Sequence, residues 1–78
     1  MTPAGNARNV NNQVSVIRSK RGLTQAELGM RVGLTRQSII AIEKKRFTPS
    51  IQSALLLAAA LKVKVDDLFW LENNKEEK

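Results

Sequence analysis

The chain has 78 residues and a net charge of +6, so it forms one small domain with a basic surface that suits phosphate groups. It contains no cysteine and no histidine, which excludes disulfides, zinc fingers and nearly every transition-metal site. Because a core of this size is modest unless a partner shares it, we expect the chain to oligomerise.

No helical periodicity marks the first twelve residues. Residues 1–12 are rich in Asn, Ala and Gly and include Pro3, so we expect a flexible N-terminal arm followed by a folded domain over residues 13–71. A short strand near Val10 that pairs with the C-terminal segment is an alternative that the residues leave open. The N-terminus also lacks the charged and then apolar pattern of a signal peptide.

The first helix is expected over residues 13–21. Val14 and Ile17 lie three positions apart and form its inward face, and a glycine ends it. Lys20 and Arg21 lie outside this apolar face, so we expect both side chains to face solvent.

The second helix begins at a capping box. Thr24 caps the helix with its hydroxyl, and Glu27, three positions later, reaches back to the Thr24 amide. Gly29 permits a close helix crossing, because a side chain there would hold the two helices apart. Gly33 then supplies the left-handed conformation that ends a helix at low cost. The inward face of this helix comprises Ala26, Leu28 and Val32.

The third helix begins at Thr35, which is placed to cap it, and its residues sort into two faces. Ile39 and Ile42 face inward. The second and third helices, joined across Gly33, form a helix-turn-helix over residues 25–44. The outward positions of the third helix are Arg36, Gln37, Ile40, Ala41 and Lys44.

The fourth helix follows a loop over residues 45–49. Phe47 is expected as a core plug under this loop, and Ser50 caps the helix behind Pro49. The apolar run from Ala54 to Leu61 has eight residues, too few to span a bilayer, so we expect a cytoplasmic protein without a membrane partner. The apolar residues more than fill one face of the helix. Those expected to face inward are Ile51, Ala54, Leu55, Leu57, Ala58 and Leu61.

A short fifth helix is expected from Val65 or Asp66 to Phe69, because two aspartates favour its N-terminus. Since all five elements are helical, the predicted fold class is all-α, a compact five-helix bundle that contains the helix-turn-helix. Residues 72–78 are charged and are expected to form a C-terminal tail.

An apolar surface is expected near the C-terminus. Leu56 points to solvent from the fourth helix, and with Phe69, Trp70 and Leu71 it forms an apolar surface larger than a monomer of this size leaves exposed. These four residues are therefore the predicted homodimer interface. The alternative is that Trp70 covers the core of its own chain.

Several segments in this order resemble the lambda Cro/C1-type, or XRE-type, helix-turn-helix family of bacterial, archaeal and phage DNA-binding regulators. The resemblance covers residues 14–69 and includes IRSKRGLTQAEL, the turn at Gly33, TRQSIIAIEK, FTPS, ALLLAAAL and VKVDDLF. It implies a lambda repressor-like DNA-binding domain in a small stand-alone transcriptional regulator. In this family an ion pair ties the first helix to the recognition helix at the positions of Arg18 and Glu43, so we expect that structural pair here.

The third helix is then the recognition helix, and its outward residues are expected to read bases in the major groove. Arginine suits the O6 and N7 acceptors of guanine, glutamine suits N6 and N7 of adenine, and an exposed isoleucine suits a thymine methyl group. The alternative for these residues is an ordinary solvent-exposed side chain. The predicted base contacts are Arg36, Gln37, Ile40 and Ala41.

Contacts to the DNA backbone are expected from residues around this helix. The first turn of the second helix offers free amides to a phosphate, and the resemblance supports Gln25 in that role. The basic run after the third helix sets affinity and salt dependence without reading bases, although such a run is often only a solvated face. In the arm, Arg8 is a further candidate. The predicted backbone contacts are Gln25, Thr35, Ser38, Lys44, Lys45 and Arg46.

The sequence therefore predicts a homodimeric repressor that binds a pseudo-palindromic operator in double-stranded DNA, with half-sites about one helical turn apart. The alternative is an antitoxin-like protein-interaction module on the same fold, with secondary DNA binding. An enzyme is not expected, because the chain has no His, no Cys and no glycine-rich phosphate loop, and Asp66 and Asp67 are better explained as helix-start residues. No cofactor, metal or small-molecule ligand is expected.

Overall fold

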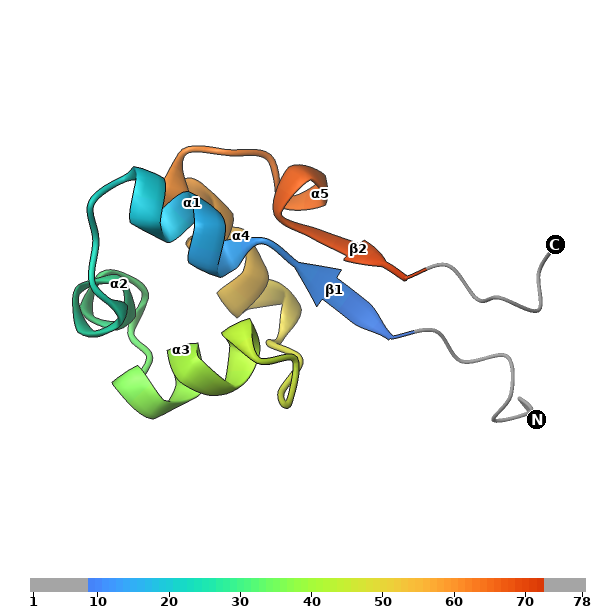
Figure 1. The fold of residues 1–78 in the computed structure, drawn as a ribbon, viewed down its shortest axis with the longest axis horizontal. Helices are drawn as coiled ribbons and strands as arrows, with labels where there is room; N and C mark the ends of the chain where they lie inside the picture. The colour runs from blue at the N-terminus through green and yellow to red at the C-terminus, as the bar shows by residue number, and fades with distance from the viewer. Residues whose placement is uncertain (1–8, 73–78) are drawn as a thin grey trace, which may run out of the picture.

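Five helices and two short strands make up the part of the chain that the computed structural model describes, residues 9–72. In chain order the elements are β1 (Val10–Asn12), α1 (Val14–Lys20), α2 (Gln25–Val32), α3 (Arg36–Glu43), α4 (Ile51–Leu61), α5 (Val65–Leu68) and β2 (Phe69–Leu71). Figure 1 shows α1 above α3, with the two strands projecting side by side from one end. Arg8 in the predicted arm, and the predicted tail beyond residue 72, lie outside the described residues.

A two-stranded antiparallel sheet corrects the prediction of an all-α fold. The β1 strand pairs with β2 in a register that places Val10 opposite Leu71 and Asn12 opposite Phe69. Segments of three residues are too short to show an alternating pattern, and the pairing joins opposite ends of the domain, so no local signal reveals it. Residues 10–12 thus belong to the folded domain rather than to a flexible arm. The strand near Val10, which the sequence leaves open as an alternative, is present.

The five predicted helices are present, and three of them begin at the expected hydroxyl caps. At α2, Thr24 Oγ1 accepts from the Glu27 amide at 3.0 Å, while the Glu27 carboxylate accepts from the Thr24 amide at 2.8 Å. This hydrogen bond from the Thr24 backbone lowers the pKa of Glu27, because it stabilises the charged carboxylate. Thr35 and Ser50 cap α3 and α4 with the hydroxyl alone, which accepts from the Ser38 and Ser53 amides, each at 3.1 Å. The last helix, α5, ends one residue earlier than expected because Phe69 continues as β2.

The core is formed by apolar side chains from all five helices. The predicted inward residues of α1 and α3 are buried, as are two of the three predicted for α2. The buried hydrophobic side chains are Val14, Ile17, Leu28, Val32, Ile39, Ile42, Leu57, Ala58, Leu61 and Leu68.

Four side chains that the sequence places in the core are exposed instead. Ile51 is 81% exposed and Leu55 is 53% exposed, because α4 packs on α2 and α5 along the side that carries Leu57. A helix that is apolar on most of its surface gives no clear periodicity to select the buried side. Ala26 is also exposed, and so is Phe47 in the loop after α3. The apolar surface of the chain is therefore larger than predicted.

Two glycines set the turn between α2 and α3. Gly33 has a φ of +76°, the left-handed conformation predicted for it. At Gly29 the close neighbour is the turn itself rather than a crossing helix, because an added Cβ would lie 2.5 Å from the carbonyl oxygen of Leu34. The Leu34 amide also donates to the Gly29 carbonyl at 2.9 Å. The absence of a side chain at Gly29 therefore allows the turn to fold back against α2.

Replacing Gly29 with alanine is expected to lower the free energy of unfolding by about 1 to 2 kcal/mol, as measured by urea unfolding. The clash with a backbone oxygen outweighs the higher helix propensity of alanine, which alone is worth about 1 kcal/mol. Ala26→Gly, at an exposed position of the same helix, is the matched control and should destabilise by about 1 kcal/mol through propensity. A Gly29→Ala protein that is more stable than the wild type would contradict the close approach.

Candidate nucleic-acid interface

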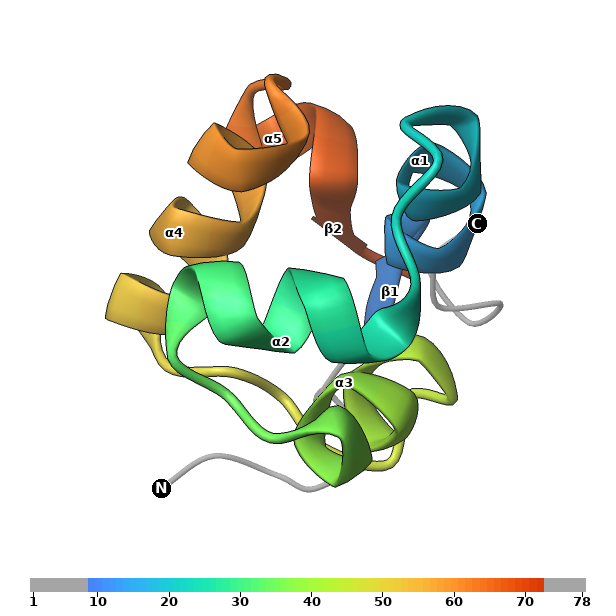
Figure 2. The ribbon, with the colours of Figure 1, turned by 90° about the vertical axis from the view of Figure 1, so that its left-hand side faces the viewer.

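The α3 helix presents one face to the core and the other to solvent. Ile39 and Ile42 are 0% and 1% exposed, which fixes the rotation of the helix about its own axis. Arg36 and Gln37 are consequently exposed in its first turn. Figure 2 shows α2 directly above α3, so the lower side of α3 faces away from the bundle.

The four predicted base-contacting residues form a stripe along α3. Arg36 and Gln37 lie in the first turn, and Ile40 and Ala41 follow four positions later, where side chains of a helix lie one above the other. The first two are exposed, whereas Ile40 and Ala41 are partly buried. We call these four residues the outer stripe.

A polar hollow joins the start of α2 to the start of α3. It has a volume of about 570 Å³, and its lining includes Thr24, Gln25, Ala26 and Arg36. The backbone amides of Gln25 and Ala26 have no acceptor among residues 9–72, as expected in the first turn of a helix. The Gln25 side chain is engaged elsewhere, because its Nε2 donates to the Glu43 carboxylate at 3.0 Å. The hollow therefore suits an anion through the free amides and the charge of Arg36, beside a Gln25 side chain that uses one of its two amide hydrogens on Glu43.

Thr35 and Ser38 flank the start of α3. Thr35 Oγ1 accepts from the Ser38 amide and donates to Ser38 Oγ, both at 3.1 Å. Because these bonds use the hydroxyl hydrogen of Thr35, the hydroxyl hydrogen of Ser38 remains available to an outside acceptor. Of the two residues, Ser38 is the better donor toward a phosphate.

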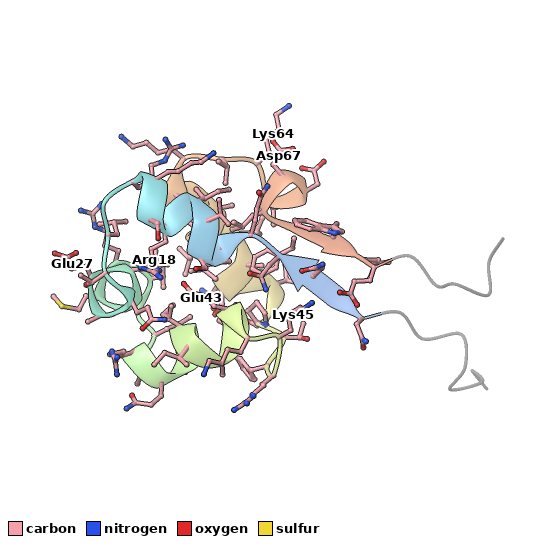
Figure 3. All side chains as sticks on the ribbon, viewed as in Figure 1. Arg18, Glu27, Glu43, Lys45, Lys64 and Asp67 are labelled. Carbon is pink, nitrogen blue, oxygen red and sulfur yellow. The ribbon has the colours of Figure 1, made fainter. Side chains whose placement is uncertain are left out.

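The basic run predicted after α3 divides into two parts. Lys45 Nζ lies 3.1 Å from the carboxylate of Glu72, the residue that follows β2 (Figure 3). Lys44 and Arg46 are exposed and form no ion pair with another described residue. Within residues 9–72, the positive charge without an ion-pair partner at the end of α3 is therefore carried by Lys44 and Arg46 rather than by Lys45.

The ion pair that the resemblance implies is present between α1 and α3. Arg18 Nε donates to Glu43 Oε2 at 2.7 Å, and Arg18 Nη1 donates to the Leu23 carbonyl at 2.8 Å. The two charged side chains are 14% and 7% exposed, and Figure 3 shows them pointing toward each other between the helices. Gln25 donates to the same carboxylate, so Glu43 holds α1, α2 and α3 together at one point.

Arg21 is exposed, as predicted, but its side chain also makes a contact that the sequence does not predict. Its Nε donates to the Leu61 carbonyl at 2.8 Å, across 40 positions of sequence. Leu61 is the last residue of α4, so the guanidinium pairs with one of the carbonyls that a helix leaves without an internal partner. No local pattern reveals this role, because the acceptor is a distant backbone atom.

Residues 9–72 carry neither a metal-binding cluster of side chains nor a membrane-spanning helix. Within that range, no group of three or more His, Cys, Asp or Glu side chains is placed to hold a metal ion. The helices of the same range are all too short or too polar to cross a lipid bilayer.

Comparisons with known proteins agree with this geometry. A family model described as helix-turn-helix matches residues 16–68. The uncharacterized HTH-type transcriptional regulator YgzD of Bacillus subtilis is 44% identical over 61 residues, which are 78% of this chain and 92% of that protein. MJ0272, an uncharacterized HTH-type transcriptional regulator of Methanocaldococcus jannaschii, is 38% identical over 64 residues, or 82% and 97% of the two chains.

Among solved structures, the P22 c2 repressor in complex with a synthetic operator is similar to this chain, with a TM-score of 0.66 and 30% identity. The similarity covers 68% of this chain and 80% of the repressor. The family match, the relatives and the fold of this repressor therefore indicate the same family. The chain belongs to the Cro/C1-type, or XRE-type, helix-turn-helix family of DNA-binding transcriptional regulators, which is not a class of enzymes.

Proposed function

We propose that the protein is a homodimeric repressor that reads a pseudo-palindromic operator through α3 in the major groove, in the cytoplasm. The observation that carries this proposal is the outer stripe, which the buried residues Ile39 and Ile42 turn away from the core. A recognition helix contacts base edges mainly through residues near its N-terminus, where Arg36 and Gln37 lie. The similarity to a repressor that was solved with its operator supports the same assignment.

Within this proposal, the residues of the outer stripe read different bases. The Arg36 guanidinium donates to O6 and N7 of a guanine, and the Gln37 amide pairs with N6 and N7 of an adenine. Ile40 contacts a thymine methyl group, and Ala41 leaves room for the close approach of the helix. Among residues 9–72, we assign base reading to these four residues of α3.

Backbone contacts surround the outer stripe. We assign phosphate contacts to the free amides at Gln25 and to the Ser38 hydroxyl on one side of the stripe. Lys44 and Arg46 supply the charge on the other side, since both lack an ion-pair partner among the described residues. Thr35 and Lys45 are assigned weaker contacts, because Thr35 caps α3 and Lys45 pairs with Glu72. These contacts fix the register of the protein on DNA without reading its sequence.

Exposed apolar side chains support a dimer. Leu56, Trp70 and Leu71 are 43%, 41% and 52% exposed, and a second copy that covers such side chains would remove their apolar surface from water. Phe69 is only partly exposed and packs against the core of its own chain, so it contributes the edge of such an interface. A two-fold dimer places two α3 helices in successive major grooves, about 34 to 36 Å apart.

The proposed function is tested by incubating the purified protein with fragmented genomic DNA at about 150 mM salt and sequencing the retained fragments. Non-specific binding is weakened at this ionic strength, so enrichment reports base reading. An inverted repeat with guanine and adenine in each half supports the dimeric regulator. A single unrepeated half-site contradicts the dimer, and no enriched sequence contradicts sequence-specific regulation.

Arg36→Ala is expected to reduce the preference for the enriched operator over an unrelated duplex by about 5- to 150-fold, the equivalent of about 1 to 3 kcal/mol. Fluorescence anisotropy titrations of both duplexes measure the ratio. Arg31→Ala is the matched control, because Arg31 is an exposed arginine in the last turn of α2 and its loss changes the net charge equally. An equal loss of preference in both variants would contradict base reading by Arg36.

A second candidate function rests on the same exposed apolar residues. In that case Trp70 and Leu71 are covered by a different protein, as in an antitoxin, and DNA binding is secondary. Light scattering separates the two candidates, because the regulator is a dimer at micromolar concentration whereas the antitoxin-like module without its partner is a monomer. A monomer that enriches no sequence favours the second candidate.

A further inference from the structure

Asn12 joins the start of α1 to the end of α3. Its Nδ2 donates to the carbonyl oxygen of Ile42 at 2.9 Å, and its Oδ1 accepts from the amide of Val14 at 3.0 Å. Val14 is the first residue of α1, and Ile42 lies in the last turn of α3. The first bond needs a donor and the second needs an acceptor. The Asn12 side-chain amide offers one of each, so it forms both bonds in a single orientation.

The Ile42 carbonyl is one of those that a helix leaves without an internal partner at its C-terminus. The Lys45 amide donates to it at 3.0 Å, and Asn12 adds a second hydrogen bond from outside the helix. The Ile42 side chain is at the same time buried in the core. Asn12 and the core therefore hold the last turn of α3 from two directions.

The paired ends of the domain determine where Asn12 lies. It is opposite Phe69 in the sheet, and Phe69 packs against the core. The next residue, Gln13, donates from its backbone amide to the Leu68 carbonyl at 3.1 Å. The backbone of Asn12 is thus fixed by β2 and α5, and its side-chain amide reaches α3 from there.

We propose that Asn12 is a positioning residue for DNA recognition, because its amide sets the position of the last turn of α3 relative to α1. This inference rests on the proposed function. Base-edge hydrogen bonds depend on accurate distances and angles, whereas contacts to phosphate charge tolerate small displacements. Ile40 and Ala41 directly precede Ile42, so a shift of that residue moves the outer stripe. Loss of the Asn12 bond lowers operator binding more than it lowers binding to unrelated DNA.

Asn12→Asp tests this role in the full chain. The carboxylate still accepts from the Val14 amide, and a negative charge at the start of α1 favours that helix, so the fold is retained. It cannot donate to the Ile42 carbonyl, and its charge repels that oxygen. The preference for the operator recovered by selection over an unrelated duplex is expected to fall about tenfold, as measured by anisotropy titration.

Asn11→Asp is the matched control, because it introduces the same charge one position away in the same strand. Asn11 Oδ1 accepts from the Asn12 amide at 2.7 Å, a hydrogen bond that an aspartate also forms. The two neighbours point to opposite faces of β1, and Asn11 makes no hydrogen bond to α3. Its operator preference is expected to stay within twofold of the wild type.

A second variant removes the effect of charge. Asn12→Ser keeps a hydroxyl acceptor near Val14 but is too short to reach the Ile42 carbonyl, and its operator preference should also fall. Circular dichroism and thermal unfolding establish that each variant is folded during the titrations. If both Asn12 variants are unfolded, Asn12 serves stability rather than positioning and the inference is overturned.

The wild-type titration separates failure of this inference from failure of the proposed function. A wild type without operator preference overturns the proposed function and the inference with it. A wild type with a clear preference, together with Asn12 variants whose preference is unchanged, overturns the inference alone. Equal losses of operator and unrelated-DNA affinity in Asn12→Ser also overturn it, because a positioning role acts on their ratio.

Discussion

Replacing Arg18 with methionine is expected to lower the free energy of unfolding by about 3 to 5 kcal/mol, which is a large part of the stability of a small domain. The reason is that Glu43, whose side chain is 7% exposed, would keep its charge without its cationic partner. The Gln25 amide remains as a donor but carries no net charge. Urea unfolding followed by circular dichroism at 222 nm, with wild type and variant compared at one temperature, measures the change.

Lys20→Met is the matched control for this variant. Lys20 belongs to the same helix, is exposed and loses the same charge on substitution, and its effect is expected to lie within about 0.5 kcal/mol. The double variant Arg18→Met/Glu43→Leu should recover much of the loss, because a buried ion pair often exchanges with apolar side chains at little net cost. If Arg18→Met is no more damaging than Lys20→Met, the pair is a solvated contact rather than a buried one.

The helix-turn-helix could be predicted from the sequence because local chemistry determines it. A hydroxyl at the start of a helix, a glutamate three positions later and a glycine at its end act through neighbouring atoms, and all three appear in the structure as predicted. In α3, Ile39 and Ile42 lie three positions apart and follow a polar first turn, which suffices to identify the buried face. The buried face determines the rotation of α3 about its axis, and therefore the direction in which the outer stripe faces.

Prediction fails where local chemistry is uniform or where the partner is distant. Every residue of α4 from Ala54 to Leu61 is apolar, so its sequence does not show that Leu55 is exposed while Leu57 is buried. The sheet, the Arg21 contact with α4 and the Asn12 contact with α3 each join residues far apart in sequence. A side chain that bonds a distant backbone carbonyl leaves no pattern in its own neighbourhood.

The same limit applies to charge. The basic run after α3 is visible in the sequence, but the pairing of Lys45 with Glu72 is not, because it depends on the sheet that brings the C-terminal end beside α3. Gln25 is a similar case, since its side chain donates one amide hydrogen to Glu43, a partner that the sequence does not reveal. In both cases the residue type indicates a polar contact, but the sequence does not identify the residue that forms the other half of that contact.

Alanine variants of the adjacent residues Ile39 and Ile40 on α3 are expected to differ in opposite ways in stability and in DNA recognition. Ile39→Ala removes buried methyl and methylene groups and leaves a cavity in the core. It is expected to lower the free energy of unfolding by about 2 to 5 kcal/mol, measured by urea unfolding. Ile40→Ala, on the partly exposed side, should change it by about 1 kcal/mol or less. The order reverses for DNA, because Ile40 belongs to the outer stripe. Under conditions in which both variants are folded, operator preference should fall for Ile40→Ala and stay near the wild-type value for Ile39→Ala. The opposite order would mean that the wrong face of α3 has been assigned to DNA.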